Sequence, residues 1–234
     1  MRKKTFIQPF ISFFLISLIL SCTGRPTEKA KMEDDQETSR ISGTEYFTSG
    51  SDNLLSWVGK KPTGQHNGTI SISEGRITVK ESVIVAGRVV FDMNSIIDLD
   101  IQDPGSNAKL VNHLKSPDFF YVEKYPKAIF EITSVKSFEA AEIKADEVQA
   151  NYQITGNLTM RDSTKSLTFP AKIDIEDDFV LVETNNFTID RTLWGVSHMS
   201  KSVFSEIRDR FVDDELTLSM KIKFKKSNLT FNYF

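Results

Sequence analysis

VQANYQITGNLTM, the stretch from Val148 to Met160, decides the fold class of this chain. Every even-numbered position in it is apolar or glycine, and every odd-numbered position is polar. A period of two residues is typical of a half-buried antiparallel strand, because successive side chains of a strand point to opposite faces. A helix would scatter the same apolar residues around its circumference. The stretch therefore predicts a strand with one apolar face.

The same alternation recurs on both sides of this stretch. Apolar and polar residues alternate from Leu167 to Ile175 and from Leu216 to Phe224, and shorter runs occur between residues 70 and 93. Turn-forming residues separate the runs at the spacing of hairpins. About eight such strands must close or stack to hide their edges. We therefore predict an all-β barrel or sandwich, with short helices at 108–115 and 202–210 at one end.

Alternation does not say which face of the strands points inward. A barrel that spans the outer membrane also alternates, with its apolar face toward lipid, and the C-terminal Phe234 is similar to the end of such a barrel. The strand ends, however, lack the aromatic girdles of a membrane barrel at both interfaces. An apolar interior is therefore the favoured interpretation.

The N-terminus has the pattern of an exported lipoprotein. Basic residues at 2–4 precede an apolar run at 10–20, and Cys22, the only cysteine, follows directly. We predict a lipoprotein signal peptide at 1–21, a flexible tether at 22–44 after lipidated Cys22, a domain at 45–226 and a tail at 227–234. An ordinary signal peptide with an unrelated cysteine is the alternative. The expected location is the cell envelope, at the outer membrane or periplasmic face rather than the inner membrane.

Composition and motifs argue against several classes of function. A net charge of −3 with 26% charged residues gives no basic excess for nucleic acid. No nucleophile elbow, phosphate loop or dinucleotide fingerprint occurs in the sequence, so we expect no enzyme and no cofactor. The three histidines, His66, His113 and His198, are not at ligand spacing on one element, so we expect no metal site.

Four segments together are similar to a known family. They are LLSWVGKKPTGQHNGT at 54–69, NHLKSPDFFYVEKYP at 112–126, ITGNLTMR at 154–161 and DRTLWGV at 190–196. In this order and spacing they resemble the YceI-like polyisoprenoid-binding family, from about residue 50 to 226. The resemblance implies an antiparallel lipocalin-like β-barrel that holds an isoprenoid, quinone or fatty chain as carrier, store or sensor. The alternative is a structural or protein-interaction lipoprotein whose barrel is filled by its own side chains.

Candidate ligand contacts lie on the apolar faces of the predicted strands. We expect Phe119 and Phe120 to cover the barrel mouth, although both could be plain core beneath a helix. Gly156 lacks a side chain on an apolar face and is expected to leave room for a chain. His113 and Arg191 are candidates for head-group contacts. The expected lining residues are Val89, Phe91, Phe130, Tyr152, Ile154, Phe169 and Phe187.

Overall fold

The computed structural model describes residues 28–29, 31–33, 42–139, 147–204 and 211–227. The predicted signal peptide, Cys22 and all but the first residue of the predicted tail lie outside this part. Most of the second predicted helix, at 202–210, also lies outside it, and Ser202–Phe204 is not helical. Among the helices that are described, none is long and apolar enough to cross a membrane.

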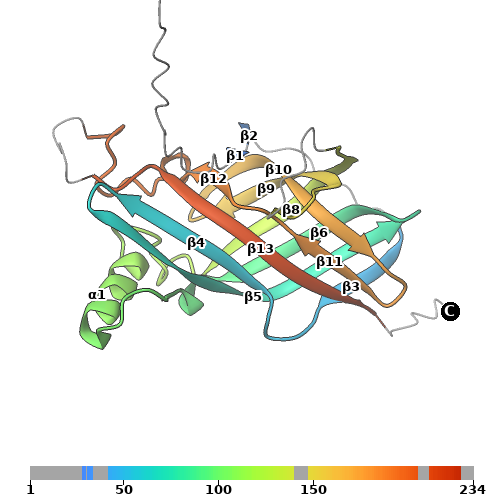
Figure 1. The fold of residues 1–234 in the computed structure, drawn as a ribbon, viewed down its shortest axis with the longest axis horizontal. Coiled ribbons are helices and arrows are strands. Elements are labelled where there is room, and N and C mark those ends of the chain that lie inside the picture. The colour runs from blue at the N-terminus through green and yellow to red at the C-terminus, as the bar shows by residue number, and fades with distance from the viewer. Residues whose placement is uncertain (1–27, 30, 34–41, 140–146, 205–210, 228–234) are drawn as a thin grey trace, which may run out of the picture.

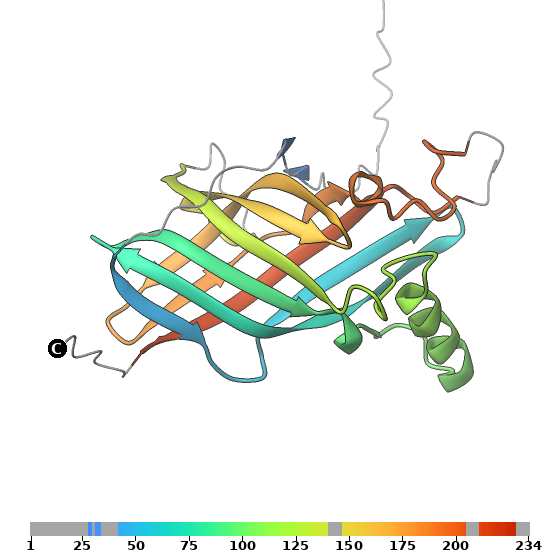
Figure 2. The ribbon, with the colours of Figure 1, turned by 180° about the vertical axis from the view of Figure 1, so that it is seen from behind.

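The main sheet closes into a ring of eight strand positions (Figures 1 and 2). All pairings between its strands are antiparallel, which confirms the predicted all-β, lipocalin-like barrel. β3 and β4 together fill one position, because both pair with β5 and with β13; β11 and β12 fill another. The strands are β3 (Thr44–Thr48), β4 (Leu54–Lys61), β5 (Gly64–Lys80), β6 (Val83–Asp92), β8 (Lys127–Ser137), β9 (Tyr152–Met160), β10 (Ser163–Ile175), β11 (Phe179–Glu183), β12 (Phe187–Asp190) and β13 (Glu215–Lys226).

The apolar face of the alternating strands points into the barrel. In β10, Leu167, Phe169, Ala171 and Ile173 are all buried, while the residues between them are more exposed. Ser166, which precedes this run, is also buried. β13 repeats the pattern at its C-terminal half, where Ile222 and Phe224 are buried. Burial of this face provides the main stabilisation of the barrel, since each fully buried large apolar side chain contributes about 1.5–3 kcal/mol.

A β-bulge separates β11 from β12. Glu183 is paired with Lys221 and Phe187 with Leu218, so four residue steps on one strand face three on the other. The extra residue reverses which parity points inward, and the buried positions change from Val180 and Val182 to Phe187 and Ile189. Nearby polar atoms secure this break, as the backbone N–H of Met220 donates to Thr184 Oγ1 at 2.9 Å.

One end of the barrel carries the only described α-helix, α1 (Pro104–Lys115), shown in Figures 1 and 2. Asp103 caps it by accepting a hydrogen bond from the backbone N–H of Ser106 at 2.8 Å. Proline is well suited to the first helical turn, which needs no donor at that point. The helix predicted at 108–115 is therefore confirmed, with a start four residues earlier. The short elements η1 (Met93–Ser95) and β7 (Ile97–Asp98) precede it, and η2 (Arg191–Trp194) lies after β12.

Two N-terminal segments lie on the barrel wall. β1 (Glu28–Lys29) pairs with β12 in parallel, and β2 (Lys31–Glu33) pairs with the first half of β10. Among the described strands β10 and β12 do not pair directly, so β1 and β2 occupy the seam between them. Met32 is half-buried and packs against the core, opposite Leu167. These five residues belong to the segment 22–44 that was predicted to be a flexible tether, and they pair with strands of the barrel wall.

Candidate functional site

A cavity of about 280 Å³ lies inside the barrel at the end that carries α1. This volume is near the lower limit of small-molecule sites, and the lining is mostly apolar. The wall is formed by inward-facing side chains of β4, β5, β6, β8, β9, β10, β12 and β13, which are Leu55, Trp57, Ile70, Phe91, Ala128, Phe130, Leu158, Met160, Leu167, Phe169, Phe187, Ile189, Leu216, Leu218 and Met220.

Four phenylalanines from four strands mark the deep end of the cavity. We call Phe91, Phe130, Phe169 and Phe187 the floor phenylalanines, because each is the last lining residue toward the far end of its strand. The rings of Phe169 and Phe187 are stacked with centroids 4.6 Å apart, and Phe130 lies 5.5 Å from Phe169. Stacked and tilted rings at such distances attract each other and exclude water. The floor is therefore closed by aromatic side chains.

Beyond the floor, the barrel is filled by its own side chains. These residues are buried but do not line the cavity: Ile77, Ile84, Ile132, Ile173, Val180, Ile222 and Phe224. Close packing of this kind leaves few voids larger than a water molecule. The barrel is thus hollow at one end and filled at the other, a combination that neither sequence-based alternative described.

Several predicted lining residues lie on the filled side of the floor. Val89 and Ile154 are buried, and Tyr152 packs half-buried against the core, yet none of them lines the cavity. Gly156 also lies outside it. By contrast, the four floor phenylalanines line the cavity, as do Phe119 and Phe120 at the mouth. Ligand contact by any of these residues stays a prediction.

Gly156 does not leave free space. A Cβ atom at this position would lie 2.5 Å from Cζ of Phe130 and 2.5 Å from the carbonyl oxygen of Glu131. The ring of Phe130 therefore occupies the volume that the missing side chain vacates. The expectation that Gly156 makes room for a ligand was wrong, because a neighbouring strand supplies the ring that covers it.

Aromatic rings from α1 and two loops meet at the mouth. His113 lies in the last turn of α1, Phe119 in the following loop and His198 in the loop after η2. Their ring centroids are 4.8–5.1 Å apart. Burial lowers the pKa of the His198 imidazole, and Coulombic interactions with His113 and Arg191 lower it further, while Asp118 opposes the shift. His198 is therefore neutral at neutral pH.

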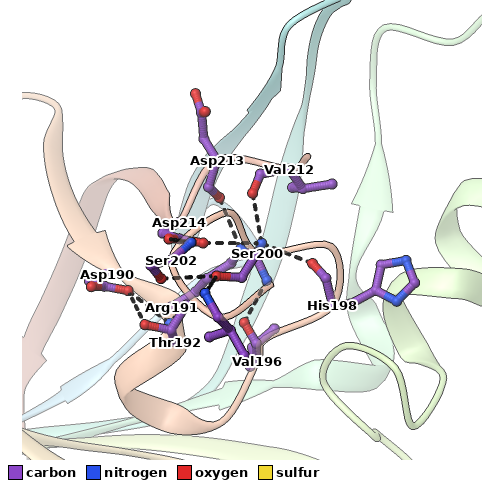
Figure 3. Close-up of polar contacts among 11 residues, drawn as sticks. Asp190, Arg191, Thr192, Val196, His198, Ser200, Ser202, Val212, Asp213 and Asp214 are labelled. Carbon is purple, nitrogen blue, oxygen red and sulfur yellow. Dashed lines mark hydrogen bonds and ion pairs between the residues drawn. The ribbon is translucent and has the colours of Figure 1, made fainter. Parts of the chain in front are cut away.

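Arg191 holds the mouth loops together (Figure 3). Its Nε donates to the carbonyl of Asp213 at 2.9 Å, its Nη1 to that of Val196, and its Nη2 to those of His198 at 3.0 Å and Val212 at 2.9 Å. The guanidinium has five N–H groups, so four are already used. Burial lowers its pKa and neighbouring carboxylates oppose this, but arginine stays charged in proteins.

The buried charge of Arg191 is balanced by Asp214, whose Oδ1 lies 3.7 Å from Nη2. Burial alone would raise the pKa of the Asp214 carboxyl, but hydrogen bonds from Ser200 and Ser202 and the Arg191 charge bring it below its usual value. The role of Arg191 is therefore structural. Arg191 also lines the cavity, with one N–H group outside these four hydrogen bonds, so its assignment as a head-group contact stays a prediction.

A second arginine, which the sequence did not single out, links two loops of the mouth. Nη1 of Arg161 donates to the carbonyl of Gly195 at 2.8 Å and to that of Phe119 at 3.2 Å. Trp194 secures the same region by donating its indole N–H to the carbonyl of Leu158 at 2.9 Å. Such contacts depend on loops far apart in sequence, and no local pattern indicates them.

The remaining lining residues were missed for another reason. Leu158 and Met160 share the inward parity of Ile154 and Gly156 on β9, and Leu167 shares that of Phe169 on β10, so the alternation identified their face correctly. It carried no information on depth along the barrel. Of the polar residues that line the cavity, the sequence analysis named His113 and Arg191 as candidate contacts and missed Lys60, Lys61, His66, His198, Asp213 and Glu215.

Comparisons with known proteins agree with this architecture. The family model of the YceI-like domain matches residues 35–224. Protein YceI of Salmonella arizonae is 35% identical over 106 residues, which are 45% of this chain and 48% of the relative, so the match spans about half of each protein. The structure of Burkholderia cenocepacia BcnA aligns with a TM-score of 0.55 and 17% identity, over 73% of this chain and 95% of that one. A polyisoprenoid-binding domain from Saccharophagus degradans aligns with a TM-score of 0.54 and 10% identity, over 78% and 98%.

Proposed function

The chain belongs to the YceI-like domain family, and we propose that its barrel binds the apolar chain of a lipid, with the polar end of the lipid at the mouth. The observation that carries this proposal is the cavity itself, which is closed by the floor phenylalanines and rimmed by charged and titratable groups at its open end. The name of the structurally similar Saccharophagus domain, which describes it as polyisoprenoid-binding, is consistent with this class of ligand.

The depth of the cavity indicates how much of a chain it accepts. The lining of β13 runs from Glu215 to Met220. Five residue steps at about 3.4 Å on a strand tilted by about 40° give a depth of about 13 Å. An extended chain advances about 1.2 Å per bond, so roughly ten carbons fit. A longer isoprenoid would fold back or protrude from the mouth.

Burial of such a chain supplies enough free energy for binding without polar contacts. Ten buried methylene groups contribute about 8 kcal/mol at about 0.8 kcal/mol each. Ordering the chain and losing its translational freedom offset part of this gain. If none of the 8 kcal/mol were offset, Kd would be about 1 μM, which is therefore the tightest binding that burial of the chain alone would give. Contacts at the rim would add selectivity for the head group.

A binding role is proposed in preference to a catalytic one. No serine or cysteine is among the described residues that line the cavity, so no hydroxyl or thiol nucleophile faces it there. Arg191 is held by backbone carbonyls, which leaves little of it for transition-state stabilisation. The ligand class is an isoprenoid, a quinone or a fatty chain, and the role is that of carrier, store or sensor.

The proposal includes an envelope location through lipidated Cys22. The basic, apolar and cysteine-terminated order of residues 1–22 supports it. Cys22→Ser should release the protein from the membrane fraction, because a lipid chain is needed for such anchoring. Retention of this variant in the membrane fraction would contradict an anchor at Cys22.

Native mass spectrometry of delipidated protein tests the binding proposal. Geraniol, farnesol and geranylgeraniol should each form a one-to-one complex, and the gain in affinity per added isoprene unit should fall sharply once the chain exceeds the cavity depth. The absence of any complex with these prenols, with a quinone and with a fatty acid would refute lipid binding. Such a result would favour the alternative, a structural or protein-interaction lipoprotein whose barrel binds no lipid.

A further inference from the structure

A cluster of one imidazole and two carboxylates lies beside the mouth, where β5 begins and β7 ends. His66, Asp98 and Asp100 offer ligand atoms that all lie within 4.8 Å of one another. His66 Nδ1 is 3.0 Å from Asp100 Oδ2. The three residues belong to segments that pair across the sheet, because Gly68 of β5 is opposite Asp98 of β7.

The hydrogen bonds of the cluster leave one buried oxygen without a partner. Asp100 Oδ1 accepts from the backbone N–H of Asn67 at 2.7 Å. Asp98 Oδ1 accepts from the backbone N–H of Ile101 at 2.9 Å and from the side-chain amide of Asn107 at 3.1 Å. Asp98 Oδ2 is buried and has no partner among the described residues. Asp98 itself is only 6% exposed.

An unpartnered carboxylate oxygen at such depth calls for a positively charged neighbour. Buried polar atoms in proteins are nearly always paired, and buried charges are paired or coordinate metals. The one described ion pair of these two carboxylates is that between Asp100 and His66. Asp98 Oδ2 therefore has neither a hydrogen-bond partner nor an ion-pair partner among the described residues.

We propose that His66, Asp98 and Asp100 form a binding site for a divalent transition-metal ion of the zinc class. One imidazole and two carboxylates are a borderline ligand set that suits Zn²⁺, Mn²⁺ or Co²⁺, whereas Ca²⁺ needs six or more oxygens. Ligands at about 2.0–2.2 Å from a metal lie about 3–4 Å from each other. The 3.0 Å separation of His66 Nδ1 and Asp100 Oδ2 already fits, and all the ligand atoms lie within 4.8 Å of one another, so a shift of about 1 Å at most would bring each pair into this range.

The position of the site gives it two consequences. Asp98 already holds α1 through Asn107, so a bound ion would join β5, β7 and α1 and stabilise this side of the mouth. Three protein ligands leave at least one coordination position open, and His66 lines the cavity. Water or an oxygen atom from the head group of a ligand could complete the coordination. The metal site itself does not depend on the lipid proposal.

A second group in the described part of the chain, His113, Asp118 and His198, serves as the comparison. Its members are more open to solvent, with side chains of His113 and Asp118 that are 40% and 61% exposed. It contains no buried side-chain atom without a partner. Solvent can satisfy these groups, so an ion is not required there.

The test is a titration of EDTA-treated, untagged protein with Zn²⁺ by calorimetry, with Co²⁺ absorption as a second probe. The wild-type protein should bind one ion, and its Tm should rise with added Zn²⁺. Asp98→Asn is isosteric and keeps the contacts of Oδ1, while Asp100→Asn alters a partly exposed group. Each should weaken Zn²⁺ binding at least about 100-fold, and the matched control Asp118→Asn should bind like the wild-type protein.

Three results would overturn the proposal. They are the absence of Zn²⁺ and Co²⁺ binding by folded wild-type protein up to millimolar concentration, undiminished binding by both Asp98→Asn and Asp100→Asn, and loss of binding in Asp118→Asn alone. If Asp98→Asn does not fold, Asp100→Asn decides alone. If added metal changes the Tm of neither protein and the Tm of Asp98→Asn lies above that of the wild-type protein, no ion is bound, and the carboxyl groups of Asp98 and Asp100 share a proton instead.

Discussion

Two buried alanines distinguish an open cavity from a packed core. Ala128 on β8 and Ala171 on β10 both face into the barrel and are 4% and 1% exposed. Ala128 lines the cavity just above the floor, whereas Ala171 lies beyond it among packed side chains. The same substitution, alanine to leucine, therefore meets free space at one position and neighbouring atoms at the other.

The expected effects have opposite signs. Ala128→Leu adds three carbons to the cavity wall and gains up to about 2.4 kcal/mol from burial at about 0.8 kcal/mol per carbon. Side-chain entropy removes about 0.5–1 kcal/mol, so the net gain is at most about 2 kcal/mol. Ala171→Leu overpacks the core and should cost about 1–3 kcal/mol. We expect the two variants to differ by at least about 1 kcal/mol and by up to about 5 kcal/mol.

Urea unfolding measures this difference, provided that the m-values of the two variants agree. Native mass spectrometry with farnesol should show weaker uptake by Ala128→Leu, because the new side chain takes the space just above the floor. Ala171→Leu, where folded, should bind farnesol like the wild-type protein. Equal destabilisation by both substitutions would refute the cavity at Ala128. Undiminished farnesol uptake by Ala128→Leu would refute a ligand position next to the floor.

Three further predictions follow from single residues. Gly156→Ala should cost about 1–3 kcal/mol in urea unfolding, because its Cβ would collide with Phe130. Gly59→Ala should change stability little, because nothing lies within 4 Å of its Cβ. Equal effects of the two substitutions would contradict the close contact between Gly156 and Phe130. Arg191→Lys should cost about 3 kcal/mol or more, because an ammonium cannot satisfy four carbonyls on the two segments at 196–198 and 212–213, and an unchanged midpoint of urea unfolding would refute the structural role. The free energy of unfolding should fall as the pH drops below about 6.5, because the pKa of His198 is lowered in the folded protein and the unfolded chain therefore binds more protons in this range. The variant His198→Gln should lack this contribution to the pH dependence of stability.

The sequence predicted the faces of the strands because burial and alternation share one physical cause. A period of two residues is enforced by the pleat, so every inward position of β9 and β10 could be identified from the pattern. The need to hide strand edges left a closed barrel and a stacked sandwich as alternatives, and the resemblance to the YceI-like family implied the barrel.

Depth within the barrel could not be predicted from this pattern. Gly156 and Leu158 are two residues apart, have the same parity and are both buried, yet only Leu158 lines the cavity. What separates them is the ring of Phe130, which reaches across from β8 and covers the glycine. The level of the floor is thus set by side chains on neighbouring strands. The alternation within one strand does not show how that strand is paired with its neighbours.

Polar roles were predicted less well than apolar ones. Arg191 follows a strand, and the sequence predicted that its charge is available to a ligand. In the structure its N–H groups donate to backbone carbonyls up to 22 residues away. Asp98 drew no attention, because a lone carboxylate near a turn is common. Its burial and its unpartnered oxygen come from the meeting of β5, β7 and α1. Such roles depend on which loops the fold brings together.

A cavity with one closed end would also determine the orientation of the lipid that we propose it binds. A polar head group placed against the floor phenylalanines would lose its contacts with water and gain no hydrogen-bond partner there, at a cost of about 2–7 kcal/mol. The same group at the mouth meets water and the side chains of His66 and Lys61. The chain must therefore enter tail first. Replacements at the floor should alter the preferred chain length, and replacements at the rim should alter the preferred head group, so the two kinds of selectivity can be measured separately.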